Sequence, residues 1–201
     1  TSWTRTNNCY FLSHEWKICS KLQNKTRIAI NIAKEFILSR IFVLMSNTSS
    51  IKWSTKHFSE LSVEELYAIL RLRSEVFVVE QNCVFLDMDN NDQIAYHTMG
   101  WLDNILVATT RLFDVDQSYK GYQSIGRVVG SPRHRGLGIG KQLMQYSIAE
   151  CERLFGKHSI KIGAQLYLKK FYEEQGFEKS GDMYYEDEIE HIPMIRDASK
   201  Y

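Results

Sequence analysis

The stretch Arg135-Gly136-Leu137-Gly138-Ile139-Gly140 decides the fold of this chain. It follows a β-branched segment, residues 124–130, and runs directly into an amphipathic segment. A glycine-rich turn at a helix start leaves several backbone N–H groups without acceptors and directs the positive end of the helix dipole at one place. Such a turn is an anion site whose usual ligand is a phosphate group, and glycine lets the backbone approach that ligand closely.

The spacing of these glycines excludes two familiar phosphate-binding patterns. A Walker loop requires glycine five positions before its Gly-Lys pair and Ser or Thr after it. Here Arg135 stands five positions before Gly140-Lys141, and Gln142 follows the pair. The dinucleotide pattern Gly-x-Gly-x-x-Gly also fails, because the glycines are spaced Gly-x-Gly-x-Gly. From the residues alone, the turn is either another kind of phosphate site or a structural helix cap.

The composition limits the class of protein. At 201 residues with 44% hydrophobic content, one domain with a real core is expected. The net charge of +1 gives no support for nucleic-acid binding. The four cysteines lack metal-ligand spacing, so no metal site is expected, and a reduced, cytoplasmic compartment fits best. No run reaches the roughly 18 apolar residues of a membrane span.

The first 44 residues differ in character from the rest. They carry seven Lys and Arg residues against two Glu, and the first methionine follows at Met45. Three interpretations stay open: a mitochondrial presequence, an extension upstream of a true start at Met45, or an ordered helix packed on the domain. We favour the second, which makes 1–44 an N-terminal extension of uncertain status and 45–201 the domain. The first would change the expected location from cytoplasmic to mitochondrial.

The rest of the chain alternates strand and helix patterns. Ser62 and Glu65 form a predicted capping box at the first helix start, and Asp103-Asn104 is expected to turn a tight hairpin. Gly176 is expected to end the last helix. The order β-α-β-β-β-α-β-α-β-β predicts a mixed α/β sheet with helices on both faces. The expected strands are 51–55, 96–101, 105–113, 124–130, 159–164, 177–185 and 189–195, and the expected helices are 61–77, 139–154 and 166–175.

This order, with Arg-x-x-Gly-x-Gly after the fourth strand, resembles the GCN5-related N-acetyltransferase (GNAT) superfamily. A second motif, Gln165 to Phe177, is similar to the family's Asn-x-x-Ala-x-x-Phe-Tyr-x-x-x-Gly-Phe, with Gln165 in place of Asn and Leu168 in place of Ala. The resemblance covers residues 51–196. It implies a GNAT fold of α/β (α+β) class, whose mixed, mostly antiparallel sheet has a splayed central strand pair. Residues 73–83, 87–89 and 191–194 further resemble ElaA-like acetyltransferases.

The resemblance implies that acetyl-coenzyme A is the acetyl donor. The backbone N–H groups of residues 137–140 would hold its pyrophosphate, with charge added by Arg135 and Lys141. The splayed strand would pair with the pantetheine amides, and an N–H near Val129 would hold the developing oxyanion. The implied coenzyme-binding residues are Val128, Val129, Arg135, Gly136, Leu137, Gly138, Ile139, Gly140, Lys141, Gln165 and Tyr172.

The catalytic groups implied by the family motif are an acid and a base. Tyr172 is expected to protonate the departing thiolate, and Glu80 is the leading candidate for the base that an amine acceptor requires. His97 and His191 are further candidates for the base, although a histidine on a strand is more often structural. Cys83 is not expected to act as a nucleophile, because members of this superfamily transfer the acetyl group directly.

The aspartate-rich segment 87–92 lacks the glycine and glutamate of a calcium-binding loop. It is expected to be a solvated loop, and the functional alternative is an acidic lip that favours a cationic acceptor.

These features predict an N-acetyltransferase that acts on an amine-bearing small molecule or peptide. The alternative is a coenzyme A-binding module with an inactive acceptor site that acts through protein contacts. A dinucleotide-binding protein is disfavoured by the glycine spacing. Many superfamily members are dimers, so a homodimer is the oligomer to test, although no residue identifies its interface.

Overall fold

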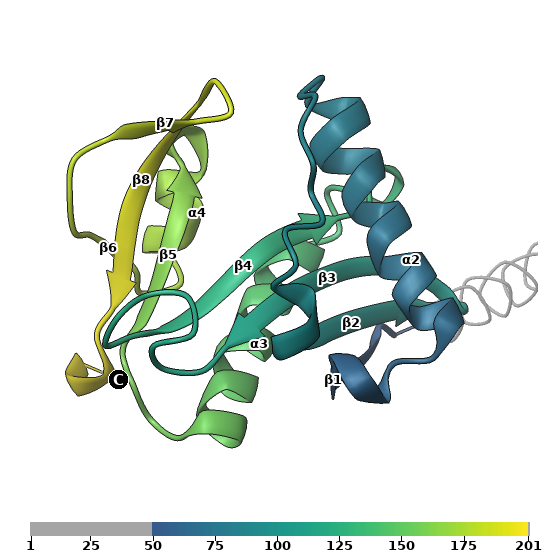
Figure 1. Ribbon diagram of the computed structural model, residues 1–201, viewed down its shortest axis with the longest axis horizontal. Helices are drawn as coiled ribbons and strands as arrows, with labels where there is room; N and C mark the ends of the chain where they lie inside the picture. Colours follow the sequence, from purple (N-terminus) through teal and green to yellow (C-terminus); the bar gives the residue numbers. More distant parts are fainter. Residues whose placement is uncertain (1–49, 201) are drawn as a thin grey trace, which may run out of the picture. The chain divides into compact units, whose positions relative to one another are not determined.

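The computed structural model describes residues 50–200, which form one mixed sheet flanked by helices (Figure 1). Residues 1–49, which include the predicted extension and Met45, lie outside the described residues. The order of the strands in space is β1-β2-β3-β4-β5-β8-β6, and β7 also pairs with β8. The strands are β1 (Lys52–His57), β2 (Tyr96–Leu102), β3 (Ile105–Phe113), β4 (Gln123–Gly130), β5 (Ile160–Gln165), β6 (Glu178–Lys179), β7 (Tyr184–Glu186) and β8 (Ile189–Arg196).

Local sequence signals account for the antiparallel half of the sheet, β1 to β4. Asp103 and Asn104 turn the β2–β3 hairpin at φ angles of 49° and 62°, which these two residue types tolerate better than most. The helix α2 (Val63–Arg73) begins at a reciprocal capping box, in which Ser62 Oγ accepts from the Glu65 N–H and the Glu65 carboxylate accepts from the Ser62 N–H. Both the hairpin and the capping box confirm the predictions from the sequence.

The central strands β4 and β5 separate soon after they meet. They pair in parallel only where Gln123 and Ser124 lie beside Ile160 and Lys161. Beyond this point β5 continues its ladder with β8 on its other side, while β4 stays with β3 (Figure 1). The facing backbone edges of β4 and β5 are therefore open along most of their length. The predicted splayed strand pair is confirmed.

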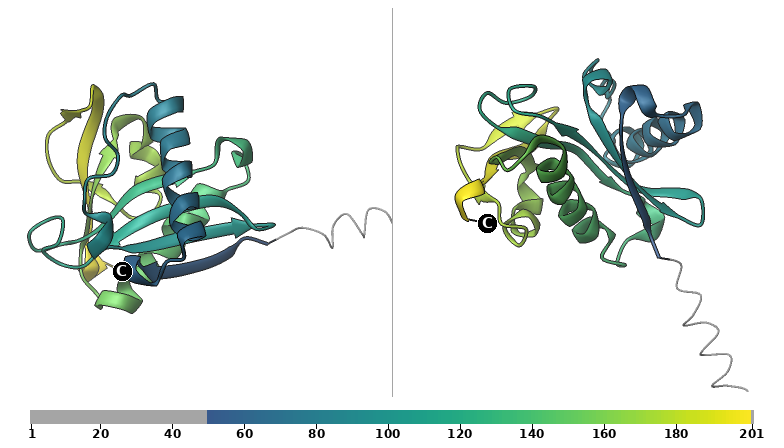
Figure 2. Two further views of the ribbon diagram at one scale, coloured as in Figure 1. Left: turned by 45° about the vertical axis from the view of Figure 1, so that its right-hand side comes forward. Right: turned by 90° about the horizontal axis from the view of Figure 1, so that it is seen from below.

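The two long helices cover opposite faces of the sheet (Figure 2). On one face, Ile69 and Leu72 of α2 pack with Met99 of β2. On the other, Met144 of α3 (Ile139–Phe155) packs with Leu112 of β3. Each of these side chains is almost completely buried, which stabilises the fold by about 1.5–3 kcal/mol per side chain. The packing fixes the start of α3 beside the open end of β4.

Three predicted segments differ from the structure. The predicted helix 61–77 is α2 up to Arg73 and then a π-helical turn, η2 (Ser74–Glu80). The predicted helix 166–175 is a 3₁₀ turn, η5 (Leu166–Leu168), followed by the short helix α4 (Lys169–Glu173). The predicted strand 177–185 is interrupted between β6 and β7. Ser180 donates its N–H to the carbonyl of Pro193, but a proline has no N–H to return, so the ladder stops there.

Candidate active site

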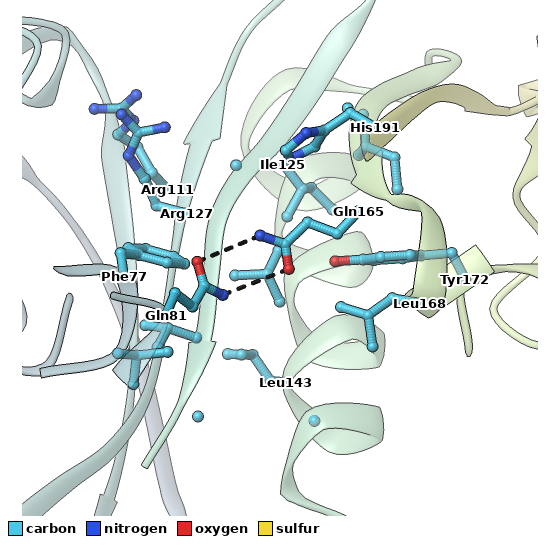
Figure 3. A pocket seen from close by; sticks show the side chains of 18 of the residues that line it. Phe77, Gln81, Arg111, Ile125, Arg127, Leu143, Gln165, Leu168, Tyr172 and His191 are labelled. Carbon is cyan, nitrogen blue, oxygen red and sulfur yellow. Dashed lines mark hydrogen bonds between the residues drawn. The ribbon is translucent and has the colours of Figure 1, made fainter. Parts of the chain in front are cut away.

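A cavity of about 1050 Å³ opens where β4 and β5 separate. Its lining comes from β4, the glycine-rich turn, η2, α4 and β8. Figure 3 shows side chains that reach the cavity from β4, η2, α4 and β8. Elements far apart in the chain thus surround one space, which is large enough for a bulky ligand.

The glycine-rich turn forms one end of this cavity. Gly136 and Gly138 have φ angles of 81° and 70°, a left-handed conformation that favours glycine. No side chain caps the start of α3 at Gly138, and its first turn holds no acidic residue. The first N–H groups of the helix therefore keep their hydrogen-bonding capacity for a ligand. With Arg135 and Lys141 also in the lining, this end is suited to an anion.

All of the predicted coenzyme-binding residues except Leu137 line the cavity. The side chain of Leu137 is 62% exposed and lies outside the lining. Any role of Leu137 in binding would therefore belong to its backbone N–H. The roles of the other residues stay predictions, but the fold does bring them together.

Tyr172 reaches the cavity from α4 and is only 6% exposed. Its ring is held edge-to-face by Phe171 and Phe177, with ring centroids 5.0 and 6.0 Å away. The hydroxyl points into the cavity towards Gln165 (Figure 3). Burial raises the pKa of Tyr172 well above its usual range, so the phenol keeps its proton at neutral pH. A protonated hydroxyl at this place can act as a proton donor.

Glu80 lies in the lining at the end of η2, where it is tied to the glycine-rich turn. Arg135 Nη1 lies 2.6 Å from Glu80 Oε1, and Arg135 Nη2 donates to Oε2 at 2.7 Å. Both carboxylate oxygens are therefore engaged by one guanidinium group. A base must offer a free lone pair, so this arrangement does not favour Glu80 as the proton acceptor while the pair is formed.

Gln165 meets Gln81 across the cavity (Figure 3). The two side-chain amides exchange long hydrogen bonds of 3.4 and 3.5 Å. Tyr167 also donates from its hydroxyl to Gln165 Oε1 at 2.7 Å. Gln165, which stands where the family motif has Asn, thus links the β5 side of the cavity to the end of η2.

The two candidate histidines lie in different surroundings. His97 is 1% exposed on β2, does not line the cavity, and has Nε2 3.1 Å from the carbonyl of Asp92. Burial lowers the pKa of His97, so its ring stays neutral in the core. This position agrees with the structural role that is more usual for a histidine on a strand. His191 on β8 does line the cavity, directly across the ladder from Gln165.

The aspartates of segment 87–92 do not form an acidic lip, and that expectation is wrong. The expected solvated loop is wrong for these three side chains, although Met88, Asn90 and Asn91 are exposed. The aspartates are tied to three arginines from α2, β3 and β4, so their charge is neutralised at the cavity wall. The pairs are Arg73–Asp87 at 2.7 Å, Arg73–Asp92 at 2.6 Å, Arg111–Asp89 at 2.6 Å, Arg111–Asp92 at 3.1 Å, Arg127–Asp87 at 2.8 Å and Arg127–Asp89 at 3.5 Å. This cluster is named the Arg–Asp network below.

Two further observations concern the described residues alone. Among residues 50–200, no group of three or more His, Cys, Asp or Glu side chains is arranged to hold a metal ion. Within the same range, no helix has the length and apolar character needed to cross a membrane.

Cys83, which is half-buried and lines the cavity, contacts the carbonyl of Asp187 through Sγ at 3.6 Å.

A model of the acetyltransferase (GNAT) domain matches residues 88–198 of the chain. The chain belongs to the GNAT family. It is 41% identical to protein ElaA of Escherichia coli strain K12 over 150 residues, which cover 74% of this chain and 97% of ElaA. Membership in the GNAT family gives the general class of reaction, transfer of an acyl group from an acyl-coenzyme A to nitrogen.

Two crystal structures resemble this GNAT chain closely. One is an acyl-CoA N-acyltransferase from Pseudomonas aeruginosa, with a TM-score of 0.68 and 41% identity, over 72% of this chain and 99% of that protein. The other is E. coli ElaA, with a TM-score of 0.68 and 40% identity, over 73% of this chain and 99% of ElaA. The predicted fold and the predicted ElaA-like membership are confirmed.

Proposed function

We propose that this GNAT protein transfers an acetyl group from acetyl-coenzyme A directly to an amine. One observation carries the proposal: the open edge of β4, Tyr172 and the uncapped start of α3 line the same cavity. This arrangement offers an anion site and a proton donor in one cavity. An extended ligand with a phosphorylated end matches both.

The residues of the turn and of β4 would bind the coenzyme. The N–H groups of Leu137 to Gly140 would hold the pyrophosphate, and Arg135 and Lys141 would add positive charge. Backbone groups of Val128 and Val129, on the open edge of β4, would pair with the pantetheine amides as an added strand does. The bound thioester supplies the acetyl group and the thiolate leaving group.

The chemistry at the thioester would use one backbone group and one side chain. A backbone N–H near Val129 would stabilise negative charge on the carbonyl oxygen. Tyr172 would give its proton to the departing thiolate, a role supported by the raised pKa that keeps the phenol protonated. Direct transfer requires no covalent enzyme intermediate, so Cys83 has no part in it.

The acceptor is an uncharged amine at the moment of reaction, carried by a small molecule or a peptide. For location we propose the cytoplasm, because the described cysteines, Cys83 and Cys151, are both free thiols. The mitochondrion is the alternative if residues 1–44 act as a presequence. A homodimer is the oligomer to be tested in solution.

The test is an amine panel with the full chain and acetyl-coenzyme A. Acetylated amine is measured by mass spectrometry and coenzyme A release by chromatography, with acid-quenched samples. We expect at least one amine to raise coenzyme A release above background, with one acetylated amine formed for each coenzyme A released. Release that is equal with and without every amine would favour the inactive binding module instead.

A further inference from the structure

We propose that His191 is the general base that takes the proton from the acceptor amine. This inference rests on the proposed acetyl transfer and names the residue that completes it. The amine nitrogen bonds to the thioester carbonyl carbon and gives one N–H proton to His191 Nε2. The C–S bond breaks, the sulfur takes the Tyr172 proton, and the imidazolium returns its proton to the tyrosinate through water.

The ring of His191 is held in the tautomer that a base needs. Its Nδ1 lies 2.9 Å from the carbonyl oxygen of Ile189. A carbonyl can only accept, so Nδ1 carries the hydrogen and Nε2 carries the free lone pair. No group among residues 50–200 forms a hydrogen bond with Nε2. The ring itself projects into the cavity beside Gln165 (Figure 3).

The orientation of this ring is fixed by its neighbours. Tyr184 of β7 stacks on it, with centroids 5.7 Å apart and planes 28° apart. Tyr184 in turn lies over Gly163 of β5, where an added Cβ would come within 2.5 Å of its hydroxyl. A larger residue at 163 would therefore push Tyr184 away from His191. Backbone carbonyl, stacked ring and glycine together preorganise the imidazole.

The other candidates for the base are less well placed. Both oxygens of Glu80 are engaged by Arg135. His97 lies outside the cavity, and His134 lies near the glycine-rich turn with Nδ1 3.2 Å from Ser131 Oγ. His191 instead shares the cavity wall with Gln165 and Tyr172, where the proposed thioester would lie.

The groups around His191 support a positive charge that forms during the reaction. Burial raises the pKa of Tyr184 to about 12, so this stacked phenol stays neutral. Glu186 and Asp187, at the β7–β8 turn, line the same cavity as His191 and add negative charge to it. The other titratable and charged side chains that line the cavity are Glu80, Cys83, Asp89, Arg111, Tyr119, Arg127, His134, Arg135, Lys141, Tyr167, Tyr172, Glu186 and Asp187.

The experiment compares His191→Gln with three controls in the full chain. The acceptor is an amine from the panel that stays uncharged over the whole pH range, so that its own ionisation does not shape the profile. We expect His191→Gln to lower kcat/KM for the amine on the order of 10²-fold and to abolish its fall at acid pH. Acetyl-coenzyme A affinity should stay within about twofold, since the coenzyme would bind at the turn and β4.

The controls separate this role from a structural one. His158→Gln changes an exposed histidine outside the cavity and should behave as the wild type. In Glu80→Gln, kcat/KM for the amine should still fall at acid pH. Tyr184→Ala removes the stacked ring from a half-exposed position, and should lower kcat while coenzyme affinity is kept. This variant tests the inference even if His191→Gln fails to fold.

Two results would overturn the inference without touching the proposed function. One is an unchanged pH profile and kcat/KM in His191→Gln, or an unchanged kcat in Tyr184→Ala if His191→Gln is unfolded. The other is a result in which Glu80→Gln loses the fall of kcat/KM at acid pH and His191→Gln keeps it. A wild-type chain that binds acetyl-coenzyme A but acetylates no amine would instead overturn the proposed function, and the inference with it.

Discussion

Arg135, the first residue of the glycine-rich motif, is bound through both terminal nitrogens by Glu80, at 2.6 and 2.7 Å. This pair joins η2 to the start of the turn that the sequence predicts to hold phosphate. The carboxylate therefore occupies the guanidinium group that a coenzyme pyrophosphate would also attract. If Arg135 binds the coenzyme as proposed, coenzyme binding competes with the pairing of Glu80 and Arg135.

Replacing Glu80 by Gln should strengthen acetyl-coenzyme A binding several-fold. The side chains of Arg135 and Glu80 are 58% and 34% exposed, so the pair contributes about 1 kcal/mol at most, which limits the gain. Calorimetric titration measures it, and Arg135→Gln should weaken binding in the same assay. An affinity in Glu80→Gln equal to or below that of the wild type would show that Arg135 does not serve the coenzyme.

Replacing Tyr172 by Phe should lower kcat on the order of 10²-fold and leave coenzyme affinity near the wild-type value. Phenylalanine keeps the packing against Phe171 and Phe177 and removes only the hydroxyl. Steady-state kinetics and calorimetry together make the comparison. Tyr167→Phe, which removes an exposed hydroxyl that binds Gln165, is the matched control. Equal losses of turnover and affinity in Tyr172→Phe would make Tyr172 a packing residue.

Replacing Arg73 by Gln should destabilise the fold by about 3–5 kcal/mol, because it leaves buried carboxylates of the Arg–Asp network without their main partner. Arg73 is 1% exposed and binds both Asp87 and Asp92. Urea unfolding measures the change. The exposed pair of Lys169 and Glu173 provides the contrast, since Lys169→Gln should cost less than about 0.5 kcal/mol. Similar costs for the two variants would contradict the account of the network.

His97 should make the fold less stable below about pH 6.5, the value at which a histidine titrates in an unfolded chain. Burial lowers the pKa of His97 in the folded state, so the folded protein binds fewer protons there than the unfolded chain. The stability that the neutral His97 ring contributes is complete above the pKa that His97 has in the unfolded chain. It is lost as the pH falls towards the lower pKa of the folded state. The free energy of unfolding therefore changes by at most about 1.4 kcal/mol per pH unit on account of His97.

Urea unfolding between pH 7 and pH 5 measures this slope. It should be smaller in His97→Gln than in the wild type, whereas His158→Gln, at an exposed site, should keep it. Identical slopes in His97→Gln and the wild type would show that His97 is not the group responsible.

Short-range signals explain why much of the fold was predictable. Asp103-Asn104 makes the hairpin, Ser62 with Glu65 starts α2, and the glycines of 136–140 make the turn before α3. Each of these rests on residues within a few positions of one another. The splayed strands followed from the family resemblance, because nothing in the composition of β4 or β5 shows that they separate.

The site was less predictable because its decisive contacts join distant residues. Arg135 and Glu80 are 55 positions apart, and Arg127 and Asp87 are 40 positions apart. The sequence placed acidic residues at 87–92 but could not show which arginines lie opposite. The sequence offered one sign of these contacts, which was the presence of two charged residues, Arg111 and Arg127, inside predicted strands. The tautomer of His191 depends on a backbone carbonyl, which no sequence pattern reveals.

The most direct test of the central claim is calorimetric titration of acetyl-coenzyme A into the full 201-residue chain, the Gly138→Glu variant and the Gly156→Glu variant. Gly138 and Gly156 flank α3 at φ angles of 70° and 83°, so both variants strain the backbone at opposite ends of one helix. Gly156 has a ψ of 176°, a conformation essentially restricted to glycine, so Gly156→Glu is the more strained variant and a strict control for the effect of strain alone. The account predicts binding in the micromolar range by the wild type and Gly156→Glu, and its loss in Gly138→Glu. Absence of binding by the folded wild type, or equal binding by folded Gly138→Glu, would contradict it.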